Sequence, residues 1–256
     1  MSESIKVYFV GTAGSGKSKL THAYQLWSQQ QGADVITVNL DPGVETLFYE
    51  PDIDIREWIS LPEIMKLYNL GPNGAQIVAA DLLSIKINEV VALLEKYGGD
   101  YVLIDTPGQI ELFAFRESSK IITDMLDPLH SLMVFLYDPM VARTPHGLVS
   151  LMMLCATVQF RFQIPLVNVL SKTDILSEEE VEKIIQWSEE PYRLYSALIE
   201  EVQSMDTALS TEIFRALETI GSYKKIIPVS SEEETGLEDI YNAIQQVYFG
   251  GEDFVR

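Results

Sequence analysis

Residues 11–18 constrain the fold of this chain more than any other segment. They read Gly-Thr-Ala-Gly-Ser-Gly-Lys-Ser and match the phosphate-binding pattern G-x-x-x-x-G-K-[ST] without deviation. The glycines let the backbone curl until successive N–H groups face a phosphate, and the helix that follows adds the positive end of its dipole. Lys17 should reach the β- and γ-phosphates, and the Ser18 hydroxyl should bind Mg²⁺. We predict nucleotide contacts from the whole segment: Gly11, Thr12, Ala13, Gly14, Ser15, Gly16, Lys17 and Ser18.

Short apolar runs alternate along the chain with longer helical patterns. This alternation predicts a parallel sheet with helices on both faces. The expected strands are Ile5–Val10, Val35–Asn39, Tyr101–Asp105, Ser131–Tyr137, Pro165–Leu170 and Lys225–Pro228. The expected helices include Lys17–Gln31, Asp81–Lys96, Leu148–Phe160 and Gly236–Phe249. The predicted fold class is α/β, a three-layer P-loop NTPase fold with a mostly parallel sheet and helical insertions.

Two stretches interrupt the alternation, and we interpret them as insertions into a single domain that spans residues 1–256. Residues 42–78 contain several prolines and should form short helices, whereas residues 177–222 are mostly charged and should be helical throughout. A helical pattern separates the strands expected at 35–39 and 101–105, so a crossover should join them in parallel. Ras-like proteins join the equivalent strands by a hairpin, and the crossover is instead similar to signal-recognition and MinD-like proteins.

The charge of the chain argues against several classes of partner. It has 18 Lys and Arg against 38 Asp and Glu, which gives a formal net charge of −20 without a basic cluster. Such a surface should repel nucleic acid and anionic lipid, so we expect neither nucleic acid nor membrane as a partner. The longest apolar run, Leu148–Phe160, is too short to span a bilayer, and we expect no signal peptide before the first strand. We expect a cytoplasmic location.

A second phosphate element is expected at Asp105-Thr106-Pro107-Gly108, which follows the apolar strand 101–105. A carboxylate at the end of a strand beside the phosphate loop can hold the Mg²⁺ shell, which makes Asp105 a candidate metal ligand. Gly108 lets its backbone N–H turn toward a γ-phosphate and could therefore form a switch that senses hydrolysis. Without the phosphate loop, the same residues would be an ordinary turn.

The base of the nucleotide is indicated by Ser171-Lys172-Thr173-Asp174, which follows the strand expected at 165–170 and matches [N/T/S]-K-x-D. The carboxylate of Asp174 can accept both donors on N1 and N2 of guanine, and adenine has no such pair. Lys172 should lie along the base and ribose. Ser171 replaces the usual Asn, which is expected to weaken the bracing of the loop. Ser230 and Ser231, after the last strand, are candidates for contact with the guanine carbonyl, so we favour GTP over ATP.

Three further motifs sharpen this interpretation. They are Asn39-Leu40-Asp41-Pro42-Gly43, Gly71-Pro72-Asn73-Gly74, and the extension of residues 105–108 through Gln109-Ile110-Glu111-Leu112-Phe113. Together they strongly resemble the GPN-loop GTPase family over nearly the whole chain, and the short length is most similar to archaeal members. The resemblance implies a constitutive homodimer that hydrolyses GTP to GDP and phosphate with Mg²⁺ and acts as a molecular switch.

The same resemblance implies roles for individual residues. Asn73 would reach into the nucleotide site of the partner subunit and form hydrogen bonds on its γ-phosphate side. Asp41 would position water or the Mg²⁺ shell, which makes it a catalytic candidate and, with Ser18 and Asp105, a metal candidate. Gln109 and Glu111 are candidates to orient the attacking water, although Glu111 could simply favour a helix N-terminus. An RNA polymerase subunit or another assembly client is implied as the partner.

Two alternatives remain open at the level of sequence. One is a MinD-like ATPase, which is weakened because Thr12 and Ala13 stand where those proteins carry a second lysine. The other is a nucleotide-gated binding switch with negligible turnover. Neither composition nor motif spacing decides between a switch and an efficient hydrolase.

Overall fold

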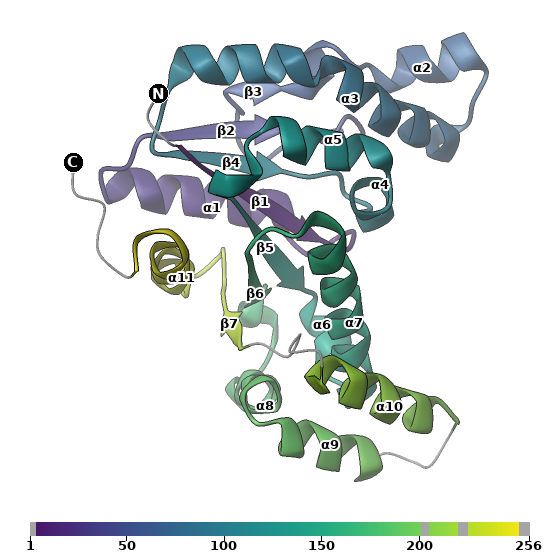
Figure 1. The fold of residues 1–256 in the computed structure, drawn as a ribbon, viewed down its shortest axis with the longest axis vertical. Helices are drawn as coiled ribbons and strands as arrows, with labels where there is room; N and C mark the ends of the chain where they lie inside the picture. Colours follow the sequence, from purple (N-terminus) through teal and green to yellow (C-terminus); the bar gives the residue numbers. More distant parts are fainter. Residues whose placement is uncertain (1–3, 201–204, 220–224, 251–256) are drawn as a thin grey trace.

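The computed structural model describes residues 4–200, 205–219 and 225–250. Within these residues, seven strands form a single sheet and every neighbouring pair is parallel. Their order across the sheet is β3-β2-β4-β1-β5-β6-β7, which puts the first strand at the centre (Figure 1). The strands are β1 (Ile5–Gly11), β2 (Val35–Asn39), β3 (Ile53–Asp54), β4 (Tyr101–Asp105), β5 (Ser131–Tyr137), β6 (Leu166–Leu170) and β7 (Ile226–Pro228). The predicted α/β P-loop NTPase fold is confirmed, and β3 is a strand that the sequence did not indicate.

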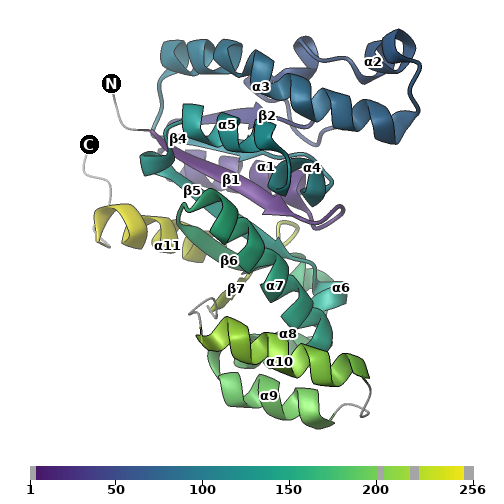
Figure 2. The same ribbon diagram turned by 45° about the vertical axis from the view of Figure 1, so that its right-hand side comes forward.

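Helices connect these strands and cover both faces of the sheet (Figures 1 and 2). The α-helices are α1 (Lys17–Gln30), α2 (Leu61–Tyr68), α3 (Pro72–Tyr97), α4 (Ile110–Ala114), α5 (Glu117–Met125), α6 (Pro139–Ala142), α7 (Pro145–Phe162), α8 (Glu178–Glu189), α9 (Pro191–Glu200), α10 (Met205–Thr219) and α11 (Leu237–Phe249). Three short 3-10 helices, η1 (Ile55–Glu57), η2 (Pro128–His130) and η3 (Thr173–Ile175), lie in the connections. Among the described residues, no helix has both the length and the apolar character needed to cross a membrane.

The core is divided by the sheet into two apolar clusters. Successive residues of a strand point to opposite faces, so Val7 and Phe9 of β1 pack against α1 and α11, whereas Tyr8 and Val10 belong to the cluster on the other face. That second face is covered by α3, α5 and α7, and its cluster extends into α8 to α10. Because both faces are buried, the strands are nearly all apolar, as the sequence showed.

The parallel sheet brings the polar segments together. The carboxyl ends of all seven strands lie at one edge, and the register places Asn39 of β2 and Phe9 of β1 beside Asp105 of β4. The phosphate loop follows β1 at this edge. The parallel pairing of β2 with β4 confirms the expected crossover between them. In open α/β sheets this edge is where ligands bind.

The segment at 71–73 differs from its expected structure. The helix predicted to begin at Asp81 begins at Pro72, and Gly71 is its N-cap residue. Proline suits the first position of a helix because its missing N–H would have no partner there and its φ is already helical. The Gly-Pro-Asn motif is therefore the first turn of α3, a helix that packs along α5 and buries Ala75 and Ala79 in the core. Residues 178–219 contribute α8, α9 and α10, which extend below the sheet in Figure 2.

Gly236 offers a test of how tightly the loop after β7 is packed. Its φ is +76° and an added Cβ would lie 2.1 Å from the carbonyl oxygen of Pro228, whereas Gly250 has a φ of +63° with open space around it. We expect Gly236→Ala to lower the free energy of unfolding by about 3 kcal/mol, from the left-handed backbone and from overpacking. Gly250→Ala should cost only about 1 kcal/mol, because only the backbone cost applies there. Urea denaturation measures both, and equal losses would contradict the packing at Gly236.

Candidate functional site

The phosphate loop between β1 and α1 curls through two glycines with positive φ, Gly14 at +75° and Gly16 at +96°. A side chain is also excluded at Gly11, where a Cβ would lie 2.7 Å from the Ser15 hydroxyl. This geometry needs glycine for steric reasons, since other residues adopt positive φ at a cost. Ala13 and Gly14 are exposed, Thr12 is half-buried, and the loop leads directly into the N-terminus of α1. The segment therefore has the form of an anion-binding turn.

Lys17 is the buried cation of the site, with a relative exposure of 5%. Its Nζ donates to three backbone carbonyl oxygens, those of Gly11, Thr12 and Gly108, each at 3.0 Å. Burial lowers the pKa of Lys17, and the nearby carboxylates of Asp105 and Asp41 oppose that shift. The ammonium thus joins the phosphate loop to the segment after β4.

Gly108 is held from its other side by Asp41. The Gly108 N–H donates to Asp41 Oδ2 at 2.8 Å, and the Gly43 N–H donates to Asp41 Oδ1 at 2.8 Å. Asn39 Oδ1 accepts from the backbone N–H of Asp41 and fixes the turn after β2. Asp41 therefore ties the segment after β2 to the segment after β4, and both of its carboxylate oxygens already accept a backbone N–H.

Asp105 is the carboxylate best arranged for a cation. It is 1% exposed, and its Oδ1 has no hydrogen-bond partner among the described residues. Burial raises the pKa of Asp105 to about 6, against the effect of the neighbouring Ser18 hydroxyl and Lys17 ammonium, which lower it. A buried carboxylate oxygen without a partner is costly unless a cation or donor meets it. Ser18 and Asp105 thus fit a small divalent cation better than Asp41 does.

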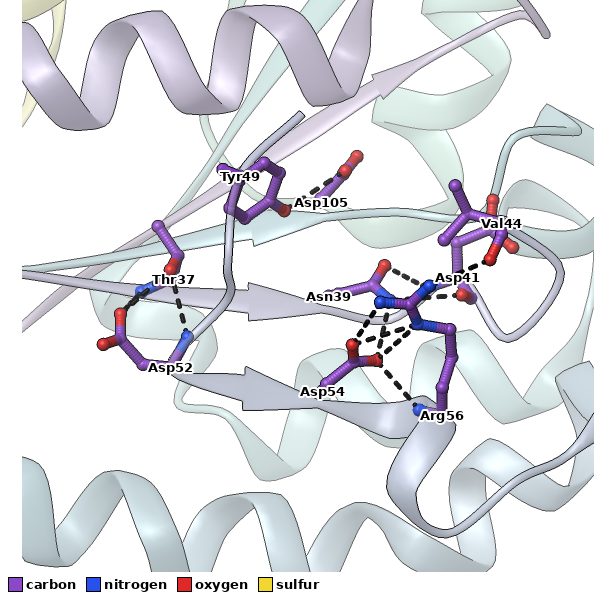
Figure 3. Close-up of polar contacts among 9 residues, drawn as sticks. All are labelled: Thr37, Asn39, Asp41, Val44, Tyr49, Asp52, Asp54, Arg56 and Asp105. Atoms are coloured by element: carbon purple, nitrogen blue, oxygen red, sulfur yellow. Dashed lines mark hydrogen bonds and ion pairs between the residues drawn. The ribbon is translucent and has the colours of Figure 1, made fainter. Parts of the chain in front are cut away.

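Tyr49 is a residue of this site that the sequence did not indicate. Its hydroxyl donates to Asp105 Oδ2 at 3.3 Å, and its ring stacks on His22 of α1 with centroids 5.9 Å apart. Glu45, Phe48 and Glu50, which flank it, are exposed, whereas Tyr49 is buried. The aromatic side chain therefore anchors the connection between β2 and β3 to the carboxylate of β4 (Figure 3).

A second anchor of that connection is Arg56. Its guanidinium binds both oxygens of Asp54 and donates to the Val44 carbonyl at 3.1 Å. Asp54 also accepts from Asn39 Nδ2 at 2.9 Å (Figure 3). These bonds lower the pKa of the Asp54 carboxyl, although burial opposes them. Arg56 and Tyr49 together fix residues 42–54 beside the phosphate loop.

The candidate base-binding residues lie after β6 and β7. Asp174 is exposed, and its Oδ1 accepts from the Ser230 hydroxyl at 2.7 Å, which itself accepts from the Glu233 N–H. Lys172 has a φ of +53°, and its ammonium donates to the Gly14 carbonyl, so its stem crosses the phosphate loop. Ser231 is half-buried in the same turn as Ser230.

Ser171 braces this loop, contrary to the expected weakening. Its hydroxyl is buried and lies 2.7 Å from the Ser15 carbonyl oxygen and 3.1 Å from that of Tyr137. The shorter contact ties the base-binding loop directly to the phosphate loop. A side chain smaller than Asn suffices here because the two loops approach closely.

The remaining catalytic candidates do not all meet. Asn73 lies in the first turn of α3 and is exposed, with no hydrogen bond to its side chain among the described residues. Glu111 is likewise exposed, in the first turn of α4. Gln109 is half-buried, and its Nε2 donates to Gln76 Oε1 at 2.9 Å. The structure therefore brings Gln109 and Asp41 next to Gly108, and leaves Asn73 and Glu111 at the surface.

Four residues of the site, Tyr49, Asp54, Arg56 and Gln76, escaped the sequence analysis. Each acts through a partner that is distant in sequence or lies in an irregular connection, so no local pattern marks it. A buried aromatic in a polar loop, such as Tyr49 before Glu50-Pro51, was the one available signal. The protein groups of this site supply few metal ligands, since the described residues contain no cluster of three His, Cys, Asp or Glu side chains.

Comparison with known proteins agrees with this geometry. A family model described as "Conserved hypothetical ATP binding protein" matches residues 9–249. The chain is 34% identical to GPN-loop GTPase PAB0955 of Pyrococcus abyssi over 245 residues, which cover 94% of this chain and 96% of that protein. It is 31% identical to GPN-loop GTPase QQT2 of Arabidopsis thaliana over 239 residues, which cover 92% of this chain and 62% of that protein. The chain thus spans about three fifths of the length of that plant relative.

A solved structure shares the fold as a whole. The crystal structure of PAB0955, described as a GTPase in apo form, superimposes with a TM-score of 0.86 at 32% sequence identity. The alignment covers 96% of this chain and 98% of that one. The arrangement of strands, phosphate loop and inserted helices is therefore similar to that of a known nucleotide-binding protein.

A pH series tests the raised pKa of Asp105. The folded protein holds this proton up to about pH 6, whereas the ordinary value is 3.8, so between these values the folded state binds more protons than the unfolded chain. Ionisation of Asp105 therefore lowers stability as the pH rises. The free energy of unfolding of Asp105→Asn relative to wild type should increase by about 2–3 kcal/mol from about pH 4 to about pH 7. Urea unfolding with EDTA and without nucleotide measures it, and a difference independent of pH would contradict the shift.

Proposed function

The chain belongs to the GPN-loop GTPase family, and from that premise we propose that it hydrolyses GTP to GDP and phosphate with Mg²⁺. The observation that carries this proposal is that the candidate phosphate-binding residues and the candidate base-binding residues lie at the same edge of the sheet. The phosphate loop with Lys17 lies on one side, and Asp174, fixed by Ser230, lies on the other. The Ser171 hydroxyl joins the two loops, so phosphate and base are recognised by one rigid unit.

The choice of guanine rests on Asp174. Its Oδ2 has no partner among the described residues, and its side chain is exposed. A carboxylate only accepts hydrogen bonds, so it complements the N1 and N2 donors of guanine and leaves no donor for adenine N1. The family model is described by ATP binding, whereas the named relatives are GTPases. The chemistry of Asp174 favours the second description.

Mg²⁺ fits the residues at the end of β4. Ser18 and the unpartnered Oδ1 of Asp105 would hold it, together with nucleotide oxygens and water. When bound, the cation neutralises charge that develops on the transferred phosphoryl group. Lys17 adds its ammonium on the phosphate side. Gln109, which follows Gly108, and Asp41, which binds the Gly108 N–H, are the candidates to orient a water. Catalysis in this arrangement depends on positioning and electrostatics, without a covalent intermediate.

We further propose that the chain acts as a homodimeric switch. Asn73 is exposed at the tip of α3 and has no partner within its own subunit among the described residues, which suits an amide that completes the site of a second copy. An uncharged donor there would polarise the phosphate where many GTPases use an arginine. By the family resemblance, the switch would serve the assembly of an RNA polymerase subunit or another client in the cytoplasm.

Phosphate release from GTP and ATP, each with Mg²⁺ and with EDTA, tests the activity directly. We expect release from GTP with Mg²⁺ only. Asp174→Asn replaces one acceptor oxygen by a donor, so it should weaken GTP binding about 100-fold or more, because two charge-assisted hydrogen bonds are disturbed. Its affinity for xanthosine triphosphate should rise, since xanthine presents an acceptor at C2. Equal turnover of ATP would favour the ATPase, and tight binding of GTP without release would favour a pure binding switch.

Asn73→Ala tests the contribution in trans. Removal of one transition-state donor should lower kcat about 100-fold while GTP affinity stays nearly constant. A subunit with Lys17→Ala should not bind nucleotide, but it still presents Asn73 to its partner. Co-purified heterodimers of the two variants should therefore recover about half of the wild-type activity from one intact composite site. Heterodimers as inactive as both parents would show that Asn73 does not act across the interface, and a monomeric wild type would exclude the dimer.

A further inference from the structure

Gln76 connects α3 to the segment that carries Gln109. It lies three residues after Asn73 on the same helix, and its side chain is half-buried against the site. Gln109 Nε2 donates to Gln76 Oε1 at 2.9 Å. The amide of Gln76 also lies beside Gly43, where an added Cβ would come within 3.2 Å of Gln76 Nε2. Gln76 therefore contacts both segments that Asp41 joins.

In the structure the hydrogen bond holds the Gln109 amide with its donor end toward Gln76. A glutamine side chain has a donor end and an acceptor end, and rotation by half a turn exchanges them. Gln76 Oε1 accepts from Nε2, the donor end of Gln109. The acceptor end of Gln109, its own Oε1, therefore faces away from Gln76 and has no hydrogen-bond partner among the described residues. An acceptor is what a group needs to orient a water molecule, because it binds one of the water protons and leaves the lone pair toward the phosphorus.

We propose that Gln76 is a positioning residue for hydrolysis, which holds Gln109 with its carbonyl oxygen presented to the attacking water. This inference rests on the proposed GTPase function. Gln76 acts only through Gln109 and within its own subunit, whereas Asn73, one helical turn earlier, is exposed and is proposed to act on a second copy. The first turns of α3 would thus serve two sites.

A purely structural role gives different expectations. Gln76 could instead only stabilise α3 against the segment before α4, as amide pairs at half-buried positions commonly do. Its loss would then lower stability, with no selective effect on kcat and no dependence on Gln109. The positioning role predicts a lower kcat, and this effect should disappear in the Gln109→Ala background. The structural role predicts lower stability, whether or not Gln109 is present.

The test compares four proteins with wild type: Gln76→Leu, Gln76→Glu, Gln109→Ala and the double variant Gln76→Leu with Gln109→Ala. Leucine has a similar size but cannot accept, so kcat for GTP should fall about 10-fold while KM and GDP affinity stay within 2-fold, as expected when only the positioning of a group is lost. Glutamate keeps an acceptor for Gln109 Nε2 and should retain most of the activity. In the Gln109→Ala background, Gln76→Leu should change kcat less than 2-fold.

Asn88→Leu is the matched control, because Asn88 is an exposed amide on the same helix but remote from the site. It should leave kcat unchanged. Unchanged turnover in Gln76→Leu, equal losses in Gln76→Leu and Gln76→Glu, or a full 10-fold loss in the Gln109→Ala background would each overturn the positioning role. Absence of GTP hydrolysis by the wild-type protein would overturn the proposed function together with this inference, so the two failures are distinguishable.

Discussion

The site depends on how Gly108 is shared between a cation and a carboxylate. Lys17 holds its carbonyl oxygen and Asp41 holds its N–H, at 3.0 Å and 2.8 Å. These two bonds fix the segment after β4 against both the phosphate loop and the turn after β2. The three segments come from adjacent strands of a parallel sheet, so their meeting follows from the order β2-β4-β1 at its centre.

The same junction explains how a chain with a net charge of −20 can bind a polyanion. Lys17 brings one positive charge, whereas Asp41 and Asp105 bring two negative charges, so the side chains alone do not attract phosphate. Backbone N–H groups of the curled loop and the N-terminus of α1 supply partial positive charge at contact range. A divalent cation at Ser18 and Asp105 would reverse the sign of the local charge. Affinity for nucleotide should therefore depend strongly on the cation.

Much of this was predictable because the informative residues follow strands. An apolar run that ends in Gly11, Asp105 or Leu170 places the next polar residues at one edge of the sheet, whatever the details of the loops. The strand positions, the parallel crossover and the fold class were confirmed for this reason. The predicted start of α3 at Asp81 is wrong because residues 42–78 were assigned to an insertion with short helices, although proline at the first helical position is a known start signal.

The contacts that escaped prediction are those between irregular segments. Tyr49 meets Asp105 across 56 residues, and Gln109 meets Gln76 across 33, so neither pair produces a local pattern. Arg56 is two residues from Asp54, but only the two-residue strand β3 places that pair beside Asn39. Ser171 was expected to weaken the bracing, yet it reaches the Ser15 carbonyl because the loops are close. Such contacts depend on tertiary distances, which a single sequence does not contain.

The arrangement also has a consequence for signalling between segments. A phosphate that accepts the Gly108 N–H must take it from Asp41, and a phosphate that binds Lys17 must compete with the Gly108 carbonyl. The hydrogen bonds of the Gly108 N–H and of the Gly108 carbonyl oxygen would thus be exchanged together. Asp41 also holds Gly43, and Gly43 lies against Gln76 of α3. A continuous series of contacts therefore runs from Gly108 through Asp41 and Gly43 to Gln76 in the first turns of α3.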